Sequence, residues 1–329
     1  MRGVNPVARG YRLDQIVEHL RAFTAVETLV ESTSSNPEIH HEDIHRPGMA
    51  LMGYTAGFHA ERIQVVGETE LGYLATLDTD SERLALRRVF ELGLGGIFIA
   101  KDLLPSAAFL DEARSAGVPI ARAALATDEL IAGLRGVLGE LFAPTENRHA
   151  TLVDVYGVGL LVTGRSGIGK SETALDLVER GHRLVADDLV MIKRRDDDVL
   201  MGRSRSNVEH LMEIRGLGVI DVFPLFGVRA IRMQKRIEVE LRLEEWDDAK
   251  EYDRHGLDRE TTEILGVTIP KVTVPIFPGK NNTVIAEIIA LDFMLKTYGI
   301  DSADDFNRKL IKTMSDSGST NRYLLHDTE

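Results

Sequence analysis

The fold of this chain is decided by the stretch VGLLVTGRSGIGKSETALDLV at residues 158–178. Its centre matches the pattern G-x-x-x-x-G-K-[ST] in full, with the residues Gly164, Arg165, Ser166, Gly167, Ile168, Gly169, Lys170 and Ser171. Glycines let successive backbone N–H groups turn inward around phosphate oxygens, and a following helix directs its N-terminal N–H groups at the same anion. Lys170 can reach the β- and γ-phosphates, and the Ser171 hydroxyl can bind Mg²⁺. The pattern predicts a nucleotide-binding loop.

The sequence on both sides supplies the strand and the helix that this motif requires. Residues 152–156 and 158–163 predict two strands paired across a glycine. Apolar residues between 174 and 178 predict a helix that ends at Gly181. Further along, strands are expected at 183–186, 190–194, 237–243 and 272–276, and a helix at 284–296. This part of the chain therefore predicts an α/β domain with a phosphate-binding loop.

Two acidic residues, Asp187 and Asp188, end the strand that follows the loop and its helix. In enzymes with this loop, a carboxylate in this place faces the metal and the γ-phosphate. Neighbouring residues of a strand point to opposite faces, so at most one of the two is expected to face the site directly. A strand-end turn with two solvated aspartates is the alternative.

The segment LMEIRGLG at residues 211–218 holds a second acidic candidate. We expect a helical piece from near Asn207 to Gly216. Glu213 can hold Mg²⁺ and Arg215 can hold phosphate, while a structural charged pair at a helix end is the alternative.

Three cationic or titratable residues, His149, Arg254 and Lys280, stand alone in polar loops, where such residues usually have no catalytic role. Lys280 follows Pro278 and Gly279 in a turn just before a predicted helix, which makes this turn a possible anion site.

The first part of the chain alternates helices and strands, which predicts an α/β layer domain. Helices are expected at 84–92, 110–116 and 130–142, and strands at 51–54, 62–66, 96–100 and 118–120. One more helix is expected to bury an apolar face made by Leu13, Ile16, Val17, Leu20 and Phe23. A polar stretch with a proline at 143–147 marks the boundary, which gives domains 1–143 and 144–329.

A histidine cluster in the first domain, His40, His41 and His45, lies beside Glu42 and Asp43. Polar tracts without periodicity are usually loops, and we interpret this segment as a solvated loop rather than a metal site.

The composition excludes several classes of protein. The 329 residues carry a net charge of −13, whereas a protein that binds duplex nucleic acid needs a basic surface. No apolar run approaches the roughly 20 residues that cross a bilayer, and the N-terminal segment has no apolar core of a secretory signal. The absence of cysteine excludes disulfides and thiolate nucleophiles. We therefore expect a cytoplasmic enzyme with no nucleic acid or membrane partner.

Several motifs together resemble the HPr kinase/phosphorylase family. They are VDVYGVGLLVTGRSGIGKSETALDLVERGHRLVADD at 153–188, MEIRGLGVIDV at 212–222, YDRHGL at 252–257 and PIFPGKN at 275–281. The first domain adds RPGMALMGY at 46–54 and ERIQVVGETE at 61–70. The resemblance spans nearly the whole chain, and Ala150 stands where the family usually has glycine after the histidine.

The resemblance implies a bifunctional enzyme that uses ATP and Mg²⁺ to phosphorylate a serine of the phosphocarrier protein HPr. In reverse, inorganic phosphate removes that group and pyrophosphate is released. Lys170 would hold the transferred phosphate, Ser171 and Glu213 would bind Mg²⁺, and Asp188 would exchange the serine proton beside a supporting Asp187.

The resemblance also implies roles for several further positions. His149 and Arg254 match functional residues of the family, and segment 212–221, with Arg215, would serve both reactions. Segment 275–280, with Pro275, Gly279 and Lys280, would serve mainly dephosphorylation. The family implies a hexamer, a catalytic domain like that of phosphoenolpyruvate carboxykinase and an N-terminal domain like a Mur-ligase substrate domain.

Two other functions fit the nucleotide loop. One is a related P-loop kinase that acts on a small molecule such as a free amino acid or carboxylate. The other is a regulator that binds a nucleotide without catalysis, although it would not need Lys170, Ser171, Asp188 and Glu213 together.

Overall fold

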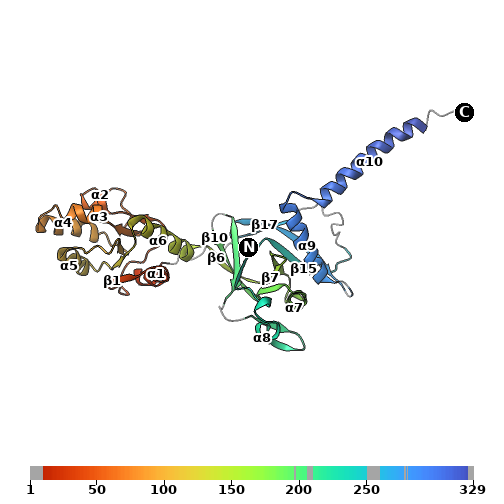
Figure 1. Ribbon diagram of the computed structural model, residues 1–329, viewed down its shortest axis with the longest axis horizontal. Helices are drawn as coiled ribbons and strands as arrows, with labels where there is room; N and C mark the ends of the chain where they lie inside the picture. The colour runs from red at the N-terminus through yellow and green to blue at the C-terminus, as the bar shows by residue number, and fades with distance from the viewer. Residues whose placement is uncertain are drawn as a thin grey trace. The chain divides into compact units, whose positions relative to one another are not determined.

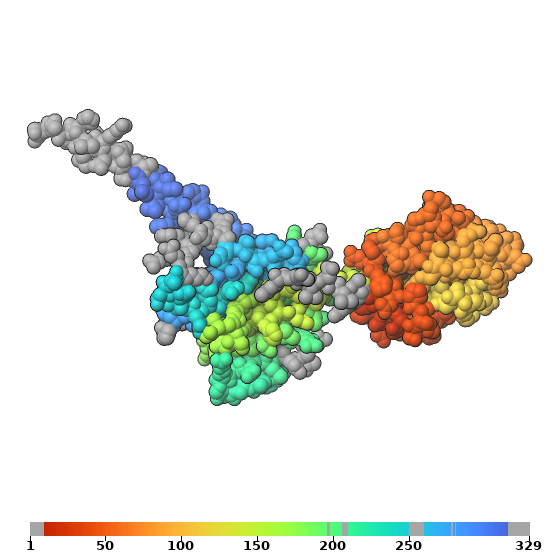
Figure 2. Space-filling view, turned by 180° about the vertical axis from the view of Figure 1, so that it is seen from behind, coloured from red at the N-terminus to blue at the C-terminus, as the bar shows by residue number. Residues whose placement is uncertain are grey.

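The computed structural model describes residues 10–195, 198–205, 210–249, 260–277, 279 and 281–324, with side chains described as far as 314. The chain divides into two compact units, Met1–Ala143 and Pro144–Glu329. In Figures 1 and 2, the first unit has the colours towards the red end of the bar and the second unit those towards the blue end. Each is described here by itself.

The first unit is an α/β layer structure. Its helices are α1 (Leu13–Leu20), α2 (Gly48–Leu51), α3 (Glu68–Leu74), α4 (Thr79–Phe90), α5 (Ala107–Ala116) and α6 (Thr127–Phe142). Its strands are β1 (Val26–Val30), β2 (Ile44–His45), β3 (Ile63–Val66), β4 (Ile97–Ile99) and β5 (Ile120–Ala123). The strands form one sheet in the order β1-β5-β4-β3-β2, in which β2 to β5 are parallel and β1 is antiparallel to β5.

Both faces of this sheet are buried, and each belongs to a separate apolar cluster. Val65 and Phe98 pack with residues of α1 and α6, whereas Val66 and Ile99 pack with residues of α2, α4 and α5. Because side chains alternate along a strand, burial at every position of β3 and β4 requires helices on both faces. The expected α/β layer domain is confirmed here.

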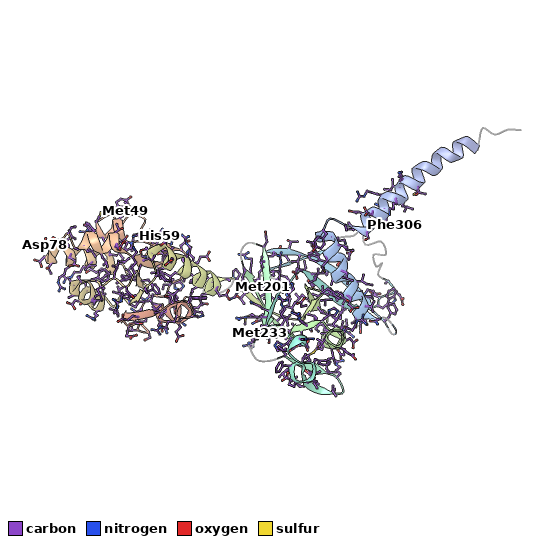
Figure 3. The ribbon with its side chains drawn as sticks, viewed as in Figure 1. Met49, His59, Asp78, Met201, Met233 and Phe306 are labelled. Atoms are coloured by element: carbon purple, nitrogen blue, oxygen red, sulfur yellow. The ribbon has the colours of Figure 1, made fainter. Side chains whose placement is uncertain are left out.

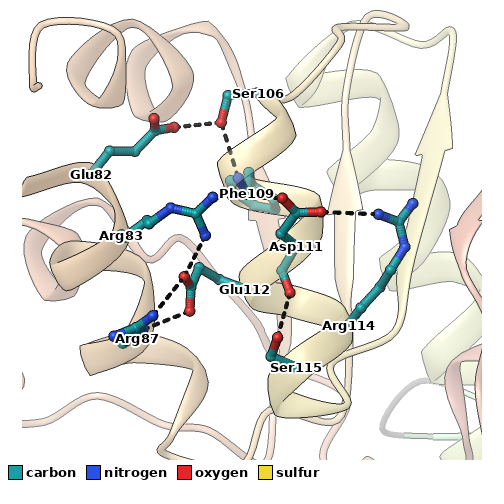
Figure 4. Close-up of polar contacts among 9 residues, drawn as sticks. All are labelled: Glu82, Arg83, Arg87, Ser106, Phe109, Asp111, Glu112, Arg114 and Ser115. Atoms are coloured by element: carbon teal, nitrogen blue, oxygen red, sulfur yellow. Dashed lines mark hydrogen bonds and ion pairs between the residues drawn. The ribbon is translucent and has the colours of Figure 1, made fainter. Parts of the chain in front are cut away.

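A buried carboxylate fixes α4 to α5, as Figure 4 shows. Glu112 of α5 accepts hydrogen bonds from Arg87 Nε at 2.7 Å and from Arg83 Nη1 at 2.7 Å. These two guanidinium groups lower the pKa of the Glu112 carboxyl from its ordinary value of 4.5 to about 2. The carboxylate is thus held ionised between the two helices.

The described residues of the second unit form three sheets. Its strands are β6 (Thr145–His149), β7 (Thr151–Val155), β8 (Val158–Thr163), β9 (Arg183–Ala186), β10 (Leu189–Arg195), β11 (Val199–Ser204), β12 (Leu211–Ile214), β13 (Gly218–Asp221), β14 (Gln234–Arg236), β15 (Val239–Glu245), β16 (Thr261–Ile264) and β17 (Val267–Ile276). Its helices are α7 (Lys170–Glu179), α8 (Val222–Phe226), α9 (Asn282–Thr297) and α10 (Ser302–Leu324), with a 3₁₀ turn at Val228–Ala230.

The largest sheet of this unit has the order β16-β17-β15-β8-β7-β9, with β17, β15 and β8 parallel to one another. On one face, Leu160 and Val162 pack against residues of α7 and α9. On the other face, Leu161 packs with Val190 and Leu200 of the antiparallel sheet β14-β11-β10-β6. The strand that leads into the nucleotide loop is therefore buried on both faces, and this fixes where the loop begins.

A buried charged cluster fixes α9 to the end of α7. Glu287 of α9 accepts hydrogen bonds from Arg180 Nε at 2.8 Å and Nη2 at 2.6 Å, and its Oε1 lies 3.0 Å from Nε2 of the buried His182. Tyr156 packs edge-on against the His182 ring, with 4.6 Å between ring centres. Hydrogen bonding from Arg180 is the main cause that lowers the pKa of Glu287 from 4.5 to about 2.

We expect Glu287→Gln to lower the free energy of unfolding by about 1–3 kcal/mol, because it removes the negative charge that accepts the Arg180 hydrogen bonds and lies beside His182. The folded pKa is the lower one, so this contribution is complete above about pH 4.5 and is lost as the pH falls towards 2. Urea unfolding at pH 7 and pH 3 measures this contribution to the free energy of unfolding. The exposed Glu179→Gln, on α7, is the control. An equal loss for the two variants would contradict the role given to this cluster.

Four predictions of local structure are wrong. His149 was expected in a polar loop but is the last residue of β6. Residues 51–54 were expected to form a strand, but α2 ends at Leu51 and a turn follows with Gly53 at φ 105°. Phe23 lies beyond the end of α1 and is 78% exposed. The helical piece expected up to Gly216 is instead strand β12, which pairs with β13 across a turn at residues 215–217. Here the alternation of buried and exposed side chains outweighed helix propensity.

The other predicted elements of the catalytic half are present, including the strands before and after the nucleotide loop and the helix between them. Among the described residues, no helix is long and apolar enough to cross a membrane.

Candidate active site

The nucleotide loop joins β8 to α7, as the motif predicts. Gly169 precedes the first residue of α7 with φ 103°, a conformation that favours glycine. Lys170 Nζ donates hydrogen bonds to the carbonyl oxygens of Gly164 at 3.3 Å and Arg165 at 3.2 Å, so its ammonium group lies across the loop. A flexible cation over a loop of backbone N–H groups is suited to bind a chain of phosphates.

Asp187 is the carboxylate that meets this loop. Its Oδ2 accepts a hydrogen bond from Ser171 Oγ at 2.8 Å, and its Oδ1 accepts one from Thr151 Oγ1 at 2.6 Å. Burial raises the pKa of Asp187, while both hydroxyl groups favour its charged form. The Ser171 hydroxyl and the Asp187 carboxylate together present oxygen ligands at the start of α7.

Asp188 has different contacts. Its side chain is 85% exposed, and its Oδ1 lies 3.6 Å from Nδ1 of His149, which is 81% exposed. The two residues come together because His149 ends β6, which pairs with β10 at Leu189, and because Ala150 N donates to Asp188 O at 3.2 Å. Asp188 has φ 63°, a left-handed conformation that aspartate tolerates. An exposed carboxylate beside a histidine is accessible to a hydroxyl group of an incoming protein.

The β12–β13 hairpin brings Arg215 to the loop. Met212 and Ile214 pack into the core cluster that contains α7 residues, and this leaves Glu213 on the exposed face of the hairpin. The Arg215 guanidinium lies so close to Gly167 that a Cβ atom at position 167 would collide with it. The Arg215 side chain is flexible and could move aside, so it is the φ of 77° at Gly167 that favours glycine here.

Some predicted site residues are not brought together. Among the described residues, no group of three or more histidine, aspartate or glutamate side chains is arranged to hold a metal, so Glu213 does not join Asp187 in such a group. The same finding applies to the histidines of the first unit. Arg254, Pro278 and Lys280 lie outside the described residues. Pro275 lies one residue before the end of β17, and Gly279 lies in a turn with φ 88°.

The residues present fit a magnesium ion all the same. Mg²⁺ is usually held by one or two carboxylates together with substrate phosphates rather than by a complete protein cage. The Ser171 hydroxyl and Asp187 supply hard oxygen ligands next to a phosphate-binding loop. Binding of Mg²⁺ here would neutralise phosphate charge as it develops.

Two contacts of the site have no signal in the sequence. Thr151 reads only as a β-branched strand residue, yet its hydroxyl holds Asp187. Arg165, inside the loop, forms an ion pair with Glu245 at the end of β15. Both contacts join strands that are neighbours in the sheet but distant in sequence.

Comparison with known proteins identifies the family. The model of the HPr Serine kinase C-terminal domain matches residues 140–310, and that of the HPr Serine kinase N terminus matches residues 12–138. The chain belongs to the HPr serine kinase family. The first match contains the loop, Asp187, Asp188 and the hairpin, so all of the described site lies within the C-terminal domain of the family.

Relatives of similar length support this membership. The HPr kinase/phosphorylase of Chloroherpeton thalassium is 43% identical over 321 residues, which cover 95% of this chain and 94% of the relative. That of Bacillus subtilis is 42% identical over 281 residues, which cover 85% and 91%. A solved structure of the Hpr(Ser) kinase/phosphatase from Coxiella burnetii is 34% identical, with a TM-score of 0.44, and covers 49% of this chain and 98% of that one.

Proposed function

We propose that this chain transfers the γ-phosphate of ATP to a serine of an HPr-like phosphocarrier protein and removes it again with inorganic phosphate, releasing pyrophosphate. The observation that carries the proposal is the nucleotide loop with Ser171 bound to Asp187 and with an exposed Asp188 beside it. Phosphoryl transfer depends mainly on positioning and on stabilisation of charge, and both are available in this arrangement.

In the forward direction, the serine oxygen of HPr attacks the γ-phosphorus, and the bond from that phosphorus to the leaving oxygen of ADP breaks. Asp188 accepts the serine proton, since its carboxylate is exposed to an incoming protein. Lys170 follows the transferred group with its ammonium, and the loop N–H groups hold the remaining phosphates. From the resemblance, Ser171 and Glu213 would hold the Mg²⁺ that offsets the charge of the phosphates, with Asp187 supporting Ser171.

In the reverse direction, an oxygen of inorganic phosphate attacks the phosphorus of phosphoserine. The bond from phosphorus to the serine oxygen breaks, Asp188 returns a proton to that oxygen, and pyrophosphate leaves. Both directions place a phosphoryl group over the same loop, so the same residues serve both. From the resemblance, His149 and Arg254 assist both directions, and segment 275–280 with Lys280 gathers phosphate for the reverse reaction.

Incubation with purified HPr, γ-labelled ATP and Mg²⁺ tests the proposal. We expect label on one serine of HPr, and we expect added inorganic phosphate to move it into pyrophosphate. Label only on a metabolite when cell extract replaces HPr would favour the alternative, a P-loop kinase for a small molecule. Nucleotide binding without any transfer would favour a regulator.

We also infer a homo-oligomer, for which the resemblance implies six subunits. Helix α10 carries exposed apolar side chains four residues apart, Phe306, Leu310 and Met314, and α9 exposes Ile288, Leu291 and Leu295. Figure 3 shows Phe306 on α10. Exposed apolar stripes of this length usually mark an interface.

Light scattering tests the inferred oligomer. We expect a mass that is a multiple of the 36.5 kDa of one chain, and six times that mass for a hexamer. A stable monomer at micromolar concentration would contradict it.

From the resemblance alone, we further propose that the second unit shares the fold of the phosphoenolpyruvate carboxykinase catalytic domain and the first unit that of a Mur-ligase substrate domain.

A further inference from the structure

We propose that Thr151 is a positioning residue of the metal site, whose hydroxyl fixes Asp187 so that Ser171 can present its oxygen to the cation. This inference rests on the proposed function, since it concerns the Mg²⁺ that phosphoryl transfer requires. It assigns a role in the reaction to a side chain that neither binds the nucleotide nor belongs to the loop.

The sheet places Thr151 beside both parts of the site. Strand β7 lies between β8, which leads into the loop, and β9, which ends just before Asp187. Thr151 pairs with Val162, close to the start of the loop, and the next residue, Leu152, pairs with Ala186. Thr151 is completely buried, so its hydroxyl has to find a partner within the protein.

The three side chains form a chain of hydrogen bonds with defined directions. Thr151 Oγ1 donates to Asp187 Oδ1 at 2.6 Å, and Ser171 Oγ lies 2.8 Å from Oδ2 and 3.1 Å from Oδ1. A hydroxyl has one proton, so Ser171 donates best to Oδ2 while Thr151 occupies Oδ1. The lone pairs of the Ser171 oxygen then point away from Asp187, and they are the ligand that this motif offers to Mg²⁺.

Loss of the Thr151 hydroxyl would free the carboxylate to rotate. Asp187 would then hold the Ser171 proton in more than one arrangement, and the serine oxygen would face the cation for only part of the time. Groups that orient metal ligands in this way typically change metal affinity or activity by about 10–100-fold. A residue with only a structural role would lower stability without a selective effect on the metal.

Thr151→Val keeps the shape and removes the donor, whereas Thr151→Ser keeps the hydroxyl. Thr283→Val is the matched control, because Thr283 is also buried and donates to Asp176 of α7 at 3.2 Å without contact to Asp187. Binding of Mn²⁺ in the presence of a non-hydrolysable ATP analogue is measured by electron paramagnetic resonance. The kinase reaction supplies a second measurement, the Mg²⁺ concentration that gives half-maximal rate.

We expect Thr151→Val to weaken Mn²⁺ binding about 10-fold and to raise the Mg²⁺ requirement by a similar factor, with kcat at saturating Mg²⁺ largely kept. Thr151→Ser and Thr283→Val should bind Mn²⁺ as the unmodified protein does. Thr151→Ala replaces the valine variant if melting shows that valine disturbs the fold.

Two outcomes overturn the inference alone, namely unchanged Mn²⁺ binding in Thr151→Val, or equal weakening in Thr151→Val and Thr283→Val. Failure of the unmodified protein to bind Mn²⁺ with the nucleotide overturns the proposed function and this inference with it.

Discussion

Asp188→Asn is expected to reduce the kinase rate by about 10²–10⁴-fold, the usual contribution of a general base. The amide keeps the shape of the side chain but cannot accept the serine proton. ATP should bind as before, since Lys170 and the loop are unchanged and the Asp188 side chain is 85% exposed, away from the Ser171–Asp187 pair. Single-turnover transfer to HPr and nucleotide binding by calorimetry separate these two effects.

Asp187→Asn is the informative comparison, because the neighbouring carboxylate has a different partner. This variant weakens the acceptor of the Ser171 hydroxyl, so its kinase defect should be reduced by raising the Mg²⁺ concentration. The defect of Asp188→Asn should not respond to Mg²⁺. If Asp187→Asn were severe at all Mg²⁺ concentrations and Asp188→Asn were mild, the assignment of the base to Asp188 would have to be reversed.

The nucleotide loop could be predicted from the sequence because all of its requirements are local. The glycine spacing, the strand before it and the helix after it lie within about twenty residues, and each has its own propensity or periodicity. The position of Asp187 and Asp188 just after a strand is local too, but their different contacts arise in the bend between β9 and β10, where Asp188 has φ 63°.

The support of the site could not be predicted in the same way. Thr151 contacts Asp187, 36 positions later, only because β7 lies next to β9 in the sheet. The Arg165–Glu245 pair likewise spans 80 positions and depends on the parallel pairing of β8 with β15. The sequence of one strand does not show which strands lie beside it. The register between strands is set only when the faces of the whole sheet are buried.

The hairpin shows how a local pattern can be ambiguous. In the segment around Glu213 and Arg215, Met212 and Ile214 alternate with polar residues, which is typical of a strand, but the run is short and ends at a glycine, as a helix often does. These two apolar side chains pack against the cluster that contains α7 residues, and this packing favours the strand. That outcome placed Glu213 on the exposed face and brought Arg215 to Gly167.

Lys170→Ala should have the other large effect, because it removes the flexible cation of the loop. In the structure its ammonium donates to Gly164 O and Arg165 O, two weak contacts at 3.3 and 3.2 Å that phosphate oxygens can replace. A charge-assisted contact is worth about 1.5–3 kcal/mol, and loss of one fixed donor to transition-state charge costs about 10²–10³-fold in rate.

Both kinase activity and phosphorolysis should therefore fall in Lys170→Ala by a factor within that range, because each reaction places a phosphoryl group over this loop. Lys296→Ala, which removes a surface ion pair of α9 with Asp292, is the control for charge and is expected to leave both rates close to normal. Initial rates in the two directions on the same HPr preparation measure the effect, and thermal melting shows that each variant is folded. Kinase turnover that is unchanged in Lys170→Ala would mean that transfer does not depend on the ammonium group of this loop.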